Sequence, residues 1–160
     1  TVLRDTVDRI TSQVNYEGPA DVDGAIGCLE RVRPGDCPKD LQQDRERAWV
    51  FLDNYLVRTF GGCAAANAAP GGLSRDHLET AIRVLERFDL VIPLANLSSP
   101  RAREAMDRAL GWHVPPESEH FCSIGRTIEL TPEQEGRLRR LNGFDEELTA
   151  RFFAEWAQGR

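Results

Sequence analysis

A short apolar segment lies between two amphipathic segments, and this alternation constrains the fold of the chain more than any other feature. Residues Asp89–Pro93 are mainly aliphatic and end at a proline, which is typical of a short buried strand. Ser74 is suited to cap a helix that precedes this strand and runs to about Arg87. Ser99, which is followed by a proline, is suited to start a second helix that ends at Gly111. Helix, strand and helix in this order predict a βα-type arrangement.

The first residues also predict a strand that leads into a helix. Val2 and Leu3 form an apolar stub, and Asp5 is a good N-cap for a helix over Thr6–Tyr16. The apolar positions of this helix recur at helical spacing, at Val7, Ile10 and Val14. Its polar positions fall on the opposite side, at Asp5, Asp8, Arg9 and Ser12. Because a buried-looking strand begins at residue 1, we expect the chain to be a fragment of a longer protein.

Turn residues and apolar periodicity divide the rest of the chain. Residues 19–40 are rich in glycine and proline and predict a loop, with or without a short helix, and residues 64–72 predict a surface loop. A helix is expected from Asp40 to about Leu56. Thr131 starts a capping box, and a last helix is expected from Phe144 or Asp145 to Ala157. In that helix the core positions are Leu148, Phe152, Phe153 and Trp156.

Composition limits the classes of protein to which the chain can belong. Its 160 residues predict a single domain, residues 1–160, and 41% of them are apolar, which is enough for a core. The net charge of −6 argues against a broad nucleic-acid interface, which needs clustered positive charge. A small phosphate pocket remains possible, because it needs only one or two arginines and some backbone donors. No apolar run approaches the roughly 20 residues that cross a bilayer.

The four cysteines carry little metal-binding signal. None of them lies in a CxxC pair, so we expect no zinc site and no other metal. Cys28 and Cys37 flank a loop rich in glycine and proline. They either form a disulfide, in an oxidising compartment, or stay free thiols, and the sequence favours neither.

The residues from Leu3 to Ser12, L-R-D-T-V-D-R-I-T-S, resemble a known phosphate-binding motif. The motif is that of the membrane-type (Golgi-type) carbohydrate O-sulfotransferases, with the form L-R-D-P-x-x-R-x-x-S. In that family the first arginine and the serine contact the 3'-phosphate of 3'-phosphoadenosine 5'-phosphosulfate (PAPS). The resemblance therefore implies that Arg4 and Ser12 bind this phosphate. The chain departs from the pattern at Thr6, where the family usually has proline.

Further segments resemble the same family in the same order. Asn54–Arg58, followed by Gly61 and Gly62, is similar to its N-[YL]-x-x-R-x-x-x-G stretch. Phe88–Pro93 is similar to its F-D-x-V strand, and Leu110–Trp112 to its L-G-W helix end. The last segment, Leu130–Trp156, is similar to its terminal helices, with Leu141–Asn142 and Asp145–Leu148 in the usual order, although Thr149 stands where the family commonly has tyrosine. Together these matches span nearly the whole chain.

The resemblance implies a fold, a cofactor and a reaction. The fold would be α/β, a P-loop-like parallel sheet flanked by helices, truncated at its N-terminal side and helix-rich in its C-terminal half. The cofactor would be PAPS, without a metal, and the reaction would move its sulfuryl group to a glycan hydroxyl, or otherwise to a protein tyrosine. The family's glycine- and lysine-rich phosphosulfate loop is missing, so this chain would hold half a donor site and no identified catalytic residue. The parent protein would be tethered in the Golgi lumen, with a cytoplasmic location as the alternative.

Two other functions compete with this one. A partial sulfotransferase-like domain can serve as a non-catalytic binding module, and the phosphosulfate loop in the longer protein would distinguish the two. A mostly helical protein unrelated to nucleotides is the third possibility, which applies if the ordered matches are accidental.

Single basic residues carry alternative interpretations. The resemblance implies that Arg126 lies in a basic loop near the cofactor and that Arg58 lines the substrate cleft. Arg58 can equally form an ion pair with an acidic neighbour such as Asp53. Arg9 is expected to support its helix through a local pair with Asp5. The histidines His113 and His120 are expected to be ordinary surface residues rather than a metal site.

Overall fold

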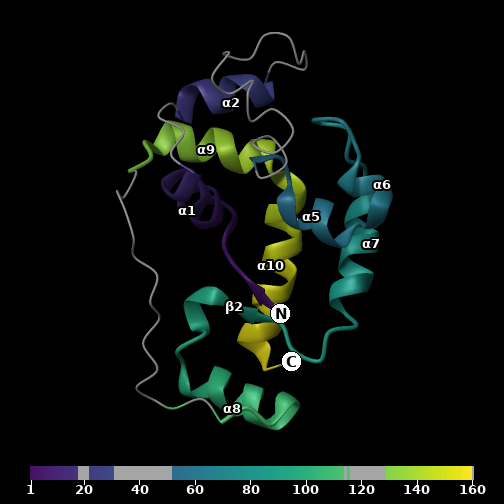
Figure 1. Ribbon diagram of the computed structural model, residues 1–160, viewed down its shortest axis with the longest axis vertical. Helices are drawn as coiled ribbons and strands as arrows, with labels where there is room; N and C mark the ends of the chain where they lie inside the picture. Colours follow the sequence, from purple (N-terminus) through teal and green to yellow (C-terminus); the bar gives the residue numbers. More distant parts are fainter. Residues whose placement is uncertain (18–21, 31–51, 114, 116–128, 160) are drawn as a thin grey trace.

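The computed structural model describes residues 1–17, 22–30, 52–113, 115 and 129–159 (Figure 1). These residues are mostly helical and include one small sheet. The elements in chain order are β1 (Val2–Leu3), α1 (Thr6–Glu17), α2 (Val22–Glu30), α5 (Tyr55–Phe60), α6 (Gly62–Ala66), α7 (Arg75–Leu85), β2 (Ile92–Pro93), η1 (Leu94–Asn96), α8 (Pro100–Leu110), α9 (Pro132–Leu141) and α10 (Gly143–Gln158).

The sheet consists of two short parallel strands that join the start of the chain to its middle. Val2 of β1 pairs with Ile92 of β2, and Leu3 pairs with Pro93. The strand expected over residues 89–93 is shorter in the structure, at Ile92–Pro93, because its partner β1 offers only Val2 and Leu3 for pairing. In the described residues the α/β character expected from the sequence is limited to this sheet within a mainly helical structure.

The starts of α1, α8 and α9 are those that the sequence predicts. The carboxylate of Asp5 accepts the backbone N–H groups of Val7 at 2.9 Å and Asp8 at 3.2 Å and so caps α1. The hydroxyl of Ser99 accepts the N–H of Ala102 at 3.1 Å at the start of α8. Thr131 opens α9 with a capping box. These caps act within three residues, which is why the sequence predicts them.

Two segments differ from the prediction. Most of the helix expected over residues 40–56 lies outside the described residues, and its described end is interrupted at Asn54, whose φ of 50° and ψ of 51° are left-handed. A new helix, α5, begins one residue later. Residues 64–66, at the start of the surface loop expected over 64–72, belong to α6, because three consecutive alanines favour a helix. The short helix allowed in the loop over 19–40 is α2.

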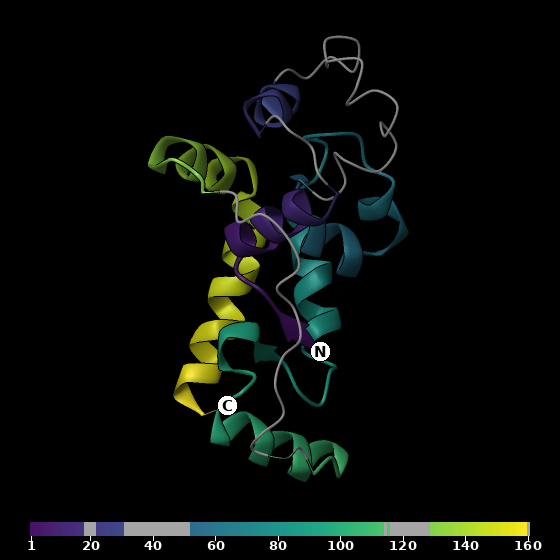
Figure 2. The same ribbon diagram turned by 60° about the vertical axis from the view of Figure 1, so that its left-hand side comes forward.

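Helix α10 is the central element of the core. It runs along the long axis of the molecule, with α2 and α9 near one end and α8 at the other (Figures 1 and 2). Leu148 and Phe152 pack with Leu3 of β1 and with α5 and α7, and Trp156 packs with Ile92 and α8. The core role predicted for these α10 residues is confirmed. None of the helices in the described part of the chain is both long and apolar enough to span a membrane.

Candidate functional site

The junction between β1 and α1 holds the motif that the sequence analysis singled out. Leu3 and Ile10 are almost fully buried, each 1% exposed, in two different core clusters. Thr6, the first residue of α1, is also buried. The apolar positions of the motif therefore fix β1 and α1 against the core, and its polar positions lie around this fixed frame.

The polar residues of the motif divide into two pairs. Asp5 and Arg9 are engaged with other elements, through ion pairs with Arg139 and Asp145. Arg4 is half-buried and Ser12 is exposed. Within the described parts of the chain, the side chains of Arg4 and Ser12 make no hydrogen bond or ion pair. Among the four residues that match the family's pattern, the two for which the resemblance implies phosphate contact are thus the two without a partner in the described parts of the chain.

Arg4 occupies the position at which parallel sheets usually bind ligands. It follows directly after the carboxyl end of β1, beside β2 and ahead of the first turn of α1. In open parallel sheets, ligands lie beyond the carboxyl ends of the strands. A guanidinium in this place can offer two parallel N–H groups to a phosphate.

The charge on Asp5 is neutralised by a basic residue of α9. Arg139 Nη1 lies 3.1 Å from Asp5 Oδ2 and 2.9 Å from Glu146 Oε2, and Arg139 also bonds to Glu135. These contacts join the start of α1 to α9 and α10. The pair of Asp5 and Arg9 predicted from their spacing is replaced by this one, because Arg9 lies closer to the interior and pairs with Asp145.

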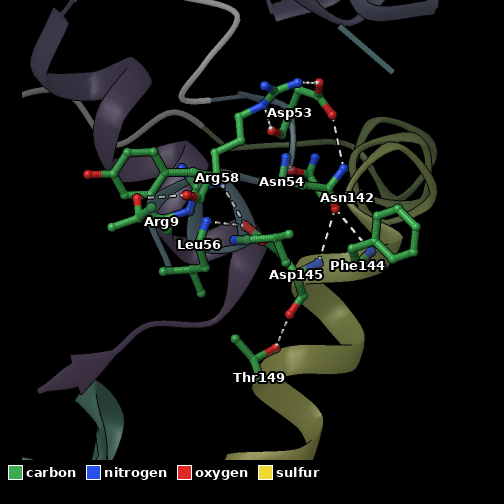
Figure 3. Close-up of polar contacts among 12 residues, drawn as sticks. Arg9, Asp53, Asn54, Leu56, Arg58, Asn142, Phe144, Asp145 and Thr149 are labelled. Atoms are coloured by element: carbon green, nitrogen blue, oxygen red, sulfur yellow. Dashed lines mark hydrogen bonds and ion pairs between the residues drawn. The ribbon is translucent and has the colours of Figure 1, made fainter. Parts of the chain in front are cut away.

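A buried polar cluster joins α1, α5 and α10 (Figure 3). Asn54 Oδ1 accepts the N–H groups of Phe144 at 3.0 Å and Asp145 at 3.1 Å, at the start of α10. In return, the Asp145 carboxylate accepts the N–H groups of Leu56 at 3.0 Å and Val57 at 2.9 Å, at the start of α5. Asn54 therefore caps α10, to which Asp145 belongs, and Asp145 caps α5, which follows Asn54. We call this arrangement the reciprocal cap.

Two further contacts complete the cluster. The N–H of Asn54 donates to Asn142 Oδ1 at 2.7 Å, which closes the reciprocal cap across the turn before α10. Arg9 Nη2 lies 3.8 Å from Asp145 Oδ2, and its guanidinium lies 5.0 Å from the ring centre of Tyr55. The sequence places Asn54, Asn142 and Asp145 in the order typical of the family but does not predict their contacts, because the partners lie 88 to 91 positions apart.

Burial raises the pKa of Asp145 to about 6, from an ordinary value of 3.8. Its hydrogen bonds from Leu56 and Val57 and its attraction to Arg9 act in the opposite direction, and the nearby carboxylate of Asp53 adds to the rise. Since the folded protein holds this proton more tightly than the unfolded chain, the stabilisation from Asp145 is greatest below pH 4. It declines as the pH rises towards 6 and is constant above that.

This titration predicts a pH-dependent difference between the wild type and Asp145→Asn. A folded pKa about 2 above the unfolded value corresponds to about 3 kcal/mol. We expect the free energy of unfolding of the wild type, minus that of the variant, to be larger at pH 4 than at pH 7 by about this amount. Urea unfolding across this range measures it. A difference that stays flat, or that grows as the pH rises, would contradict the prediction.

Arg58 is directed into the protein. Its side chain is 1% exposed and forms an ion pair with Asp53 (Figure 3). The guanidinium also donates to the backbone carbonyls of Asp53, Ala65, Ala68 and Ala69. The ion pair that the sequence allowed is therefore present. A role in lining a substrate cleft requires an accessible guanidinium, and in this structure the guanidinium of Arg58 is enclosed.

The remaining predicted residues lie elsewhere or outside the described residues. Arg126, His120 and Cys37 are outside them, so the cofactor contact, the second histidine and the disulfide stay predictions. His113 is 87% exposed and pairs with Asp107 at 2.7 Å, beside an open pocket on α8 that also includes Trp112. Among the described residues no group of histidine, cysteine and carboxylate side chains is arranged to hold a metal.

Comparisons of the chain with protein-family models, with curated proteins and with solved structures find no match. The resemblance to sulfotransferases therefore rests on the residues quoted above and on their order. The observations that concern function are the burial of those residues and the contacts that they make.

Proposed function

We propose that this chain belongs to a PAPS-dependent sulfotransferase and carries the half of the donor site that holds the 3'-phosphate. One observation supports the proposal above all others. Of the four polar residues that match the family's pattern, Asp5 and Arg9 hold α1, while Arg4 and Ser12 have no partner among the described residues. A helix motif with a purely structural role would not require an arginine directly after β1 that none of the described residues pairs with.

The chemistry of the two residues suits a phosphate dianion. The guanidinium of Arg4 supplies a permanent charge and a planar pair of donors, and the hydroxyl of Ser12 supplies a third donor. Asp8 is exposed on the same face of α1 as Ser12. Because Asp8 precedes Ser12 by about one helical turn, it lies on the side of Ser12 nearer to Arg4, and its negative charge acts against phosphate binding there.

The finer parts of the proposal follow from the resemblance. The two-stranded parallel sheet would be part of a larger P-loop-like sheet, and the acceptor would be a glycan hydroxyl, with a protein tyrosine as the second choice. The parent protein would reside in the Golgi lumen. The residues of this chain would anchor and orient the donor, and the proton of the acceptor hydroxyl would be taken by a group that we do not assign.

Binding of 3'-phosphoadenosine 5'-phosphate (PAP), measured by titration calorimetry at pH 7.5, tests the proposal. We expect Arg4→Ala to weaken binding about 10- to 100-fold, because a charge-assisted hydrogen bond contributes about 1.5–3 kcal/mol. Ser12→Ala should weaken it less, about 2- to 10-fold, because its hydroxyl is neutral. Adenosine 5'-phosphate, which lacks the 3'-phosphate, should bind the wild type and Arg4→Ala equally.

Arg108→Ala is the matched control. Arg108 is an exposed arginine of α8 that pairs only locally with Glu104, so its loss should leave PAP affinity unchanged. Equal affinity of the wild type and Arg4→Ala for PAP would remove Arg4 from the site. PAP binding without sulfuryl transfer by the longer protein would favour the non-catalytic binding module instead.

A further inference from the structure

The reciprocal cap holds one carboxylate in a fixed place inside the protein. Two backbone N–H groups of α5 bind Asp145 from one side, and Asn54 holds the first turn of α10, to which Asp145 belongs, from the other. Thr149 adds a bond to the backbone carbonyl of Asp145 at 2.9 Å. A carboxylate with this many fixed neighbours cannot move without opening two helix starts at once.

Arg9, a residue of α1, contacts the carboxylate of Asp145. Its side chain is 12% exposed and lies between Asp145 and the ring of Tyr55, so that α10 and α5 both contact it. Burial lowers the pKa of Arg9, and the attraction to Asp145 and Tyr55 opposes that change. The contact is therefore an ion pair shielded from solvent, in which direction and distance matter more than at the surface.

The position of Arg9 along α1 links its ion pair with Asp145 to the orientation of the motif residues Arg4 and Ser12. Arg9 lies between Arg4 and Ser12, and a helix turns as one body, so any rotation that moves Arg9 also moves Ser12. The apolar stripe of α1 holds its inner face against the core, but apolar packing is not directional. The ion pairs of Arg9 with Asp145 and of Asp5 with Arg139 supply directional contacts to other elements.

We infer that Asp145 and Arg9 are positioning residues that set the rotation of α1 and thereby bring Arg4 and Ser12 to a common ligand. This inference rests on the proposed phosphate site. It gives a role to two sequence segments, around Asn54 and around Asp145, that resemble the family but that the donor site itself does not use. Neither residue touches the ligand; both act through the placement of α1.

A double-mutant cycle on PAP affinity separates positioning from a general loss of stability. Asp145→Asn, which keeps the size of the side chain, should weaken PAP binding about 10-fold when Arg4 is present. In a background that carries both Arg4→Ala and Ser12→Ala the same change should weaken binding less than about 3-fold, because both contacts that depend on positioning are already lost. Equal losses in the two backgrounds would overturn the inference.

Arg9 is tested by a conservative and a non-conservative change. Arg9→Lys keeps the charge that faces Asp145 and should recover most of the PAP affinity, whereas Arg9→Met keeps only the apolar stem and should match Asp145→Asn. Both proteins are compared at a temperature at which circular dichroism shows them to be folded. If Arg9→Lys and Arg9→Met bind PAP equally, the charge on Arg9 does not position the site.

A measurement without ligand distinguishes failure of this inference from failure of the proposed function. In amide hydrogen exchange, Asp145→Asn should speed exchange in α1 at least about 10-fold more than in α7, which serves as the internal reference. The backbone resonances of Arg4 and Ser12 should also shift. If the wild type binds no PAP, the phosphate site is wrong whatever the exchange shows. Unchanged resonances and exchange in α1 would refute the positioning role alone.

Discussion

Replacing Arg58 with alanine is expected to lower the free energy of unfolding by about 4 kcal/mol. The change removes donors to four backbone carbonyls and leaves the carboxylate of Asp53 buried without its charged partner. Removing one partner of a buried ion pair typically costs about 3–5 kcal/mol. Since domains of this size are stable by only about 5–15 kcal/mol, the loss would bring the protein close to unfolding at room temperature.

Urea unfolding of Arg58→Ala, Arg58→Lys and Arg83→Ala measures this effect. Lysine keeps the charge but not the planar set of donors, so Arg58→Lys should lose about half as much stability as Arg58→Ala. Arg83 is an exposed arginine of α7 whose one bond within the described residues is to Thr80, and its loss should cost less than about 0.5 kcal/mol. A loss below about 1 kcal/mol for Arg58→Ala would contradict the structural role.

The same variants test the substrate-binding role that the resemblance implies for Arg58. A residue that lines a substrate cleft would lose activity in the longer protein at nearly constant stability. A residue enclosed by backbone carbonyls would lose stability first. The contacts of the guanidinium predict the second outcome.

Replacing Asn54 with alanine is the second large change, with an expected loss of about 3–4 kcal/mol. Its side chain accepts the first N–H groups of α10 and donates to Leu141 and Asp53, so that alanine leaves several buried groups without partners. Its φ of 50° adds a second cost, because a left-handed backbone is strained for alanine by about 1 kcal/mol.

Asn54→Gly separates the two costs. Glycine adopts the left-handed conformation without strain but makes none of the hydrogen bonds, so its stability should lie about 1 kcal/mol above that of Asn54→Ala. Thermal and urea unfolding of both variants give the comparison. If Asn54→Gly were as stable as the wild type, the hydrogen bonds of the side chain to α10 would contribute nothing, and the reciprocal cap would be disproved.

The elements that the sequence predicts correctly are those defined by neighbouring residues. Asp5, Ser99 and Thr131 each cap a helix through N–H groups two or three positions ahead, so the signal and its partner occur in one short stretch. The apolar stripe of α10, from Leu148 to Trp156, repeats at helical spacing and is buried as expected. The small extent of the sheet was not predictable, because strand pairing depends on residues about 90 positions apart.

The candidate site likewise has features that the sequence predicts and contacts that depend on the tertiary structure. The sequence by itself determined that Arg4 follows a short apolar strand and that Ser12 lies on the polar side of α1. Only the tertiary structure decided that Asp5 pairs with Arg139, that Arg9 reaches Asp145 and that Arg58 is enclosed. The physical reason is that a side chain's charge is encoded locally, whereas its partner is chosen by the packing of helices from distant parts of the chain. The internal ion pairs thus selected which charges of the motif remain available to bind a ligand.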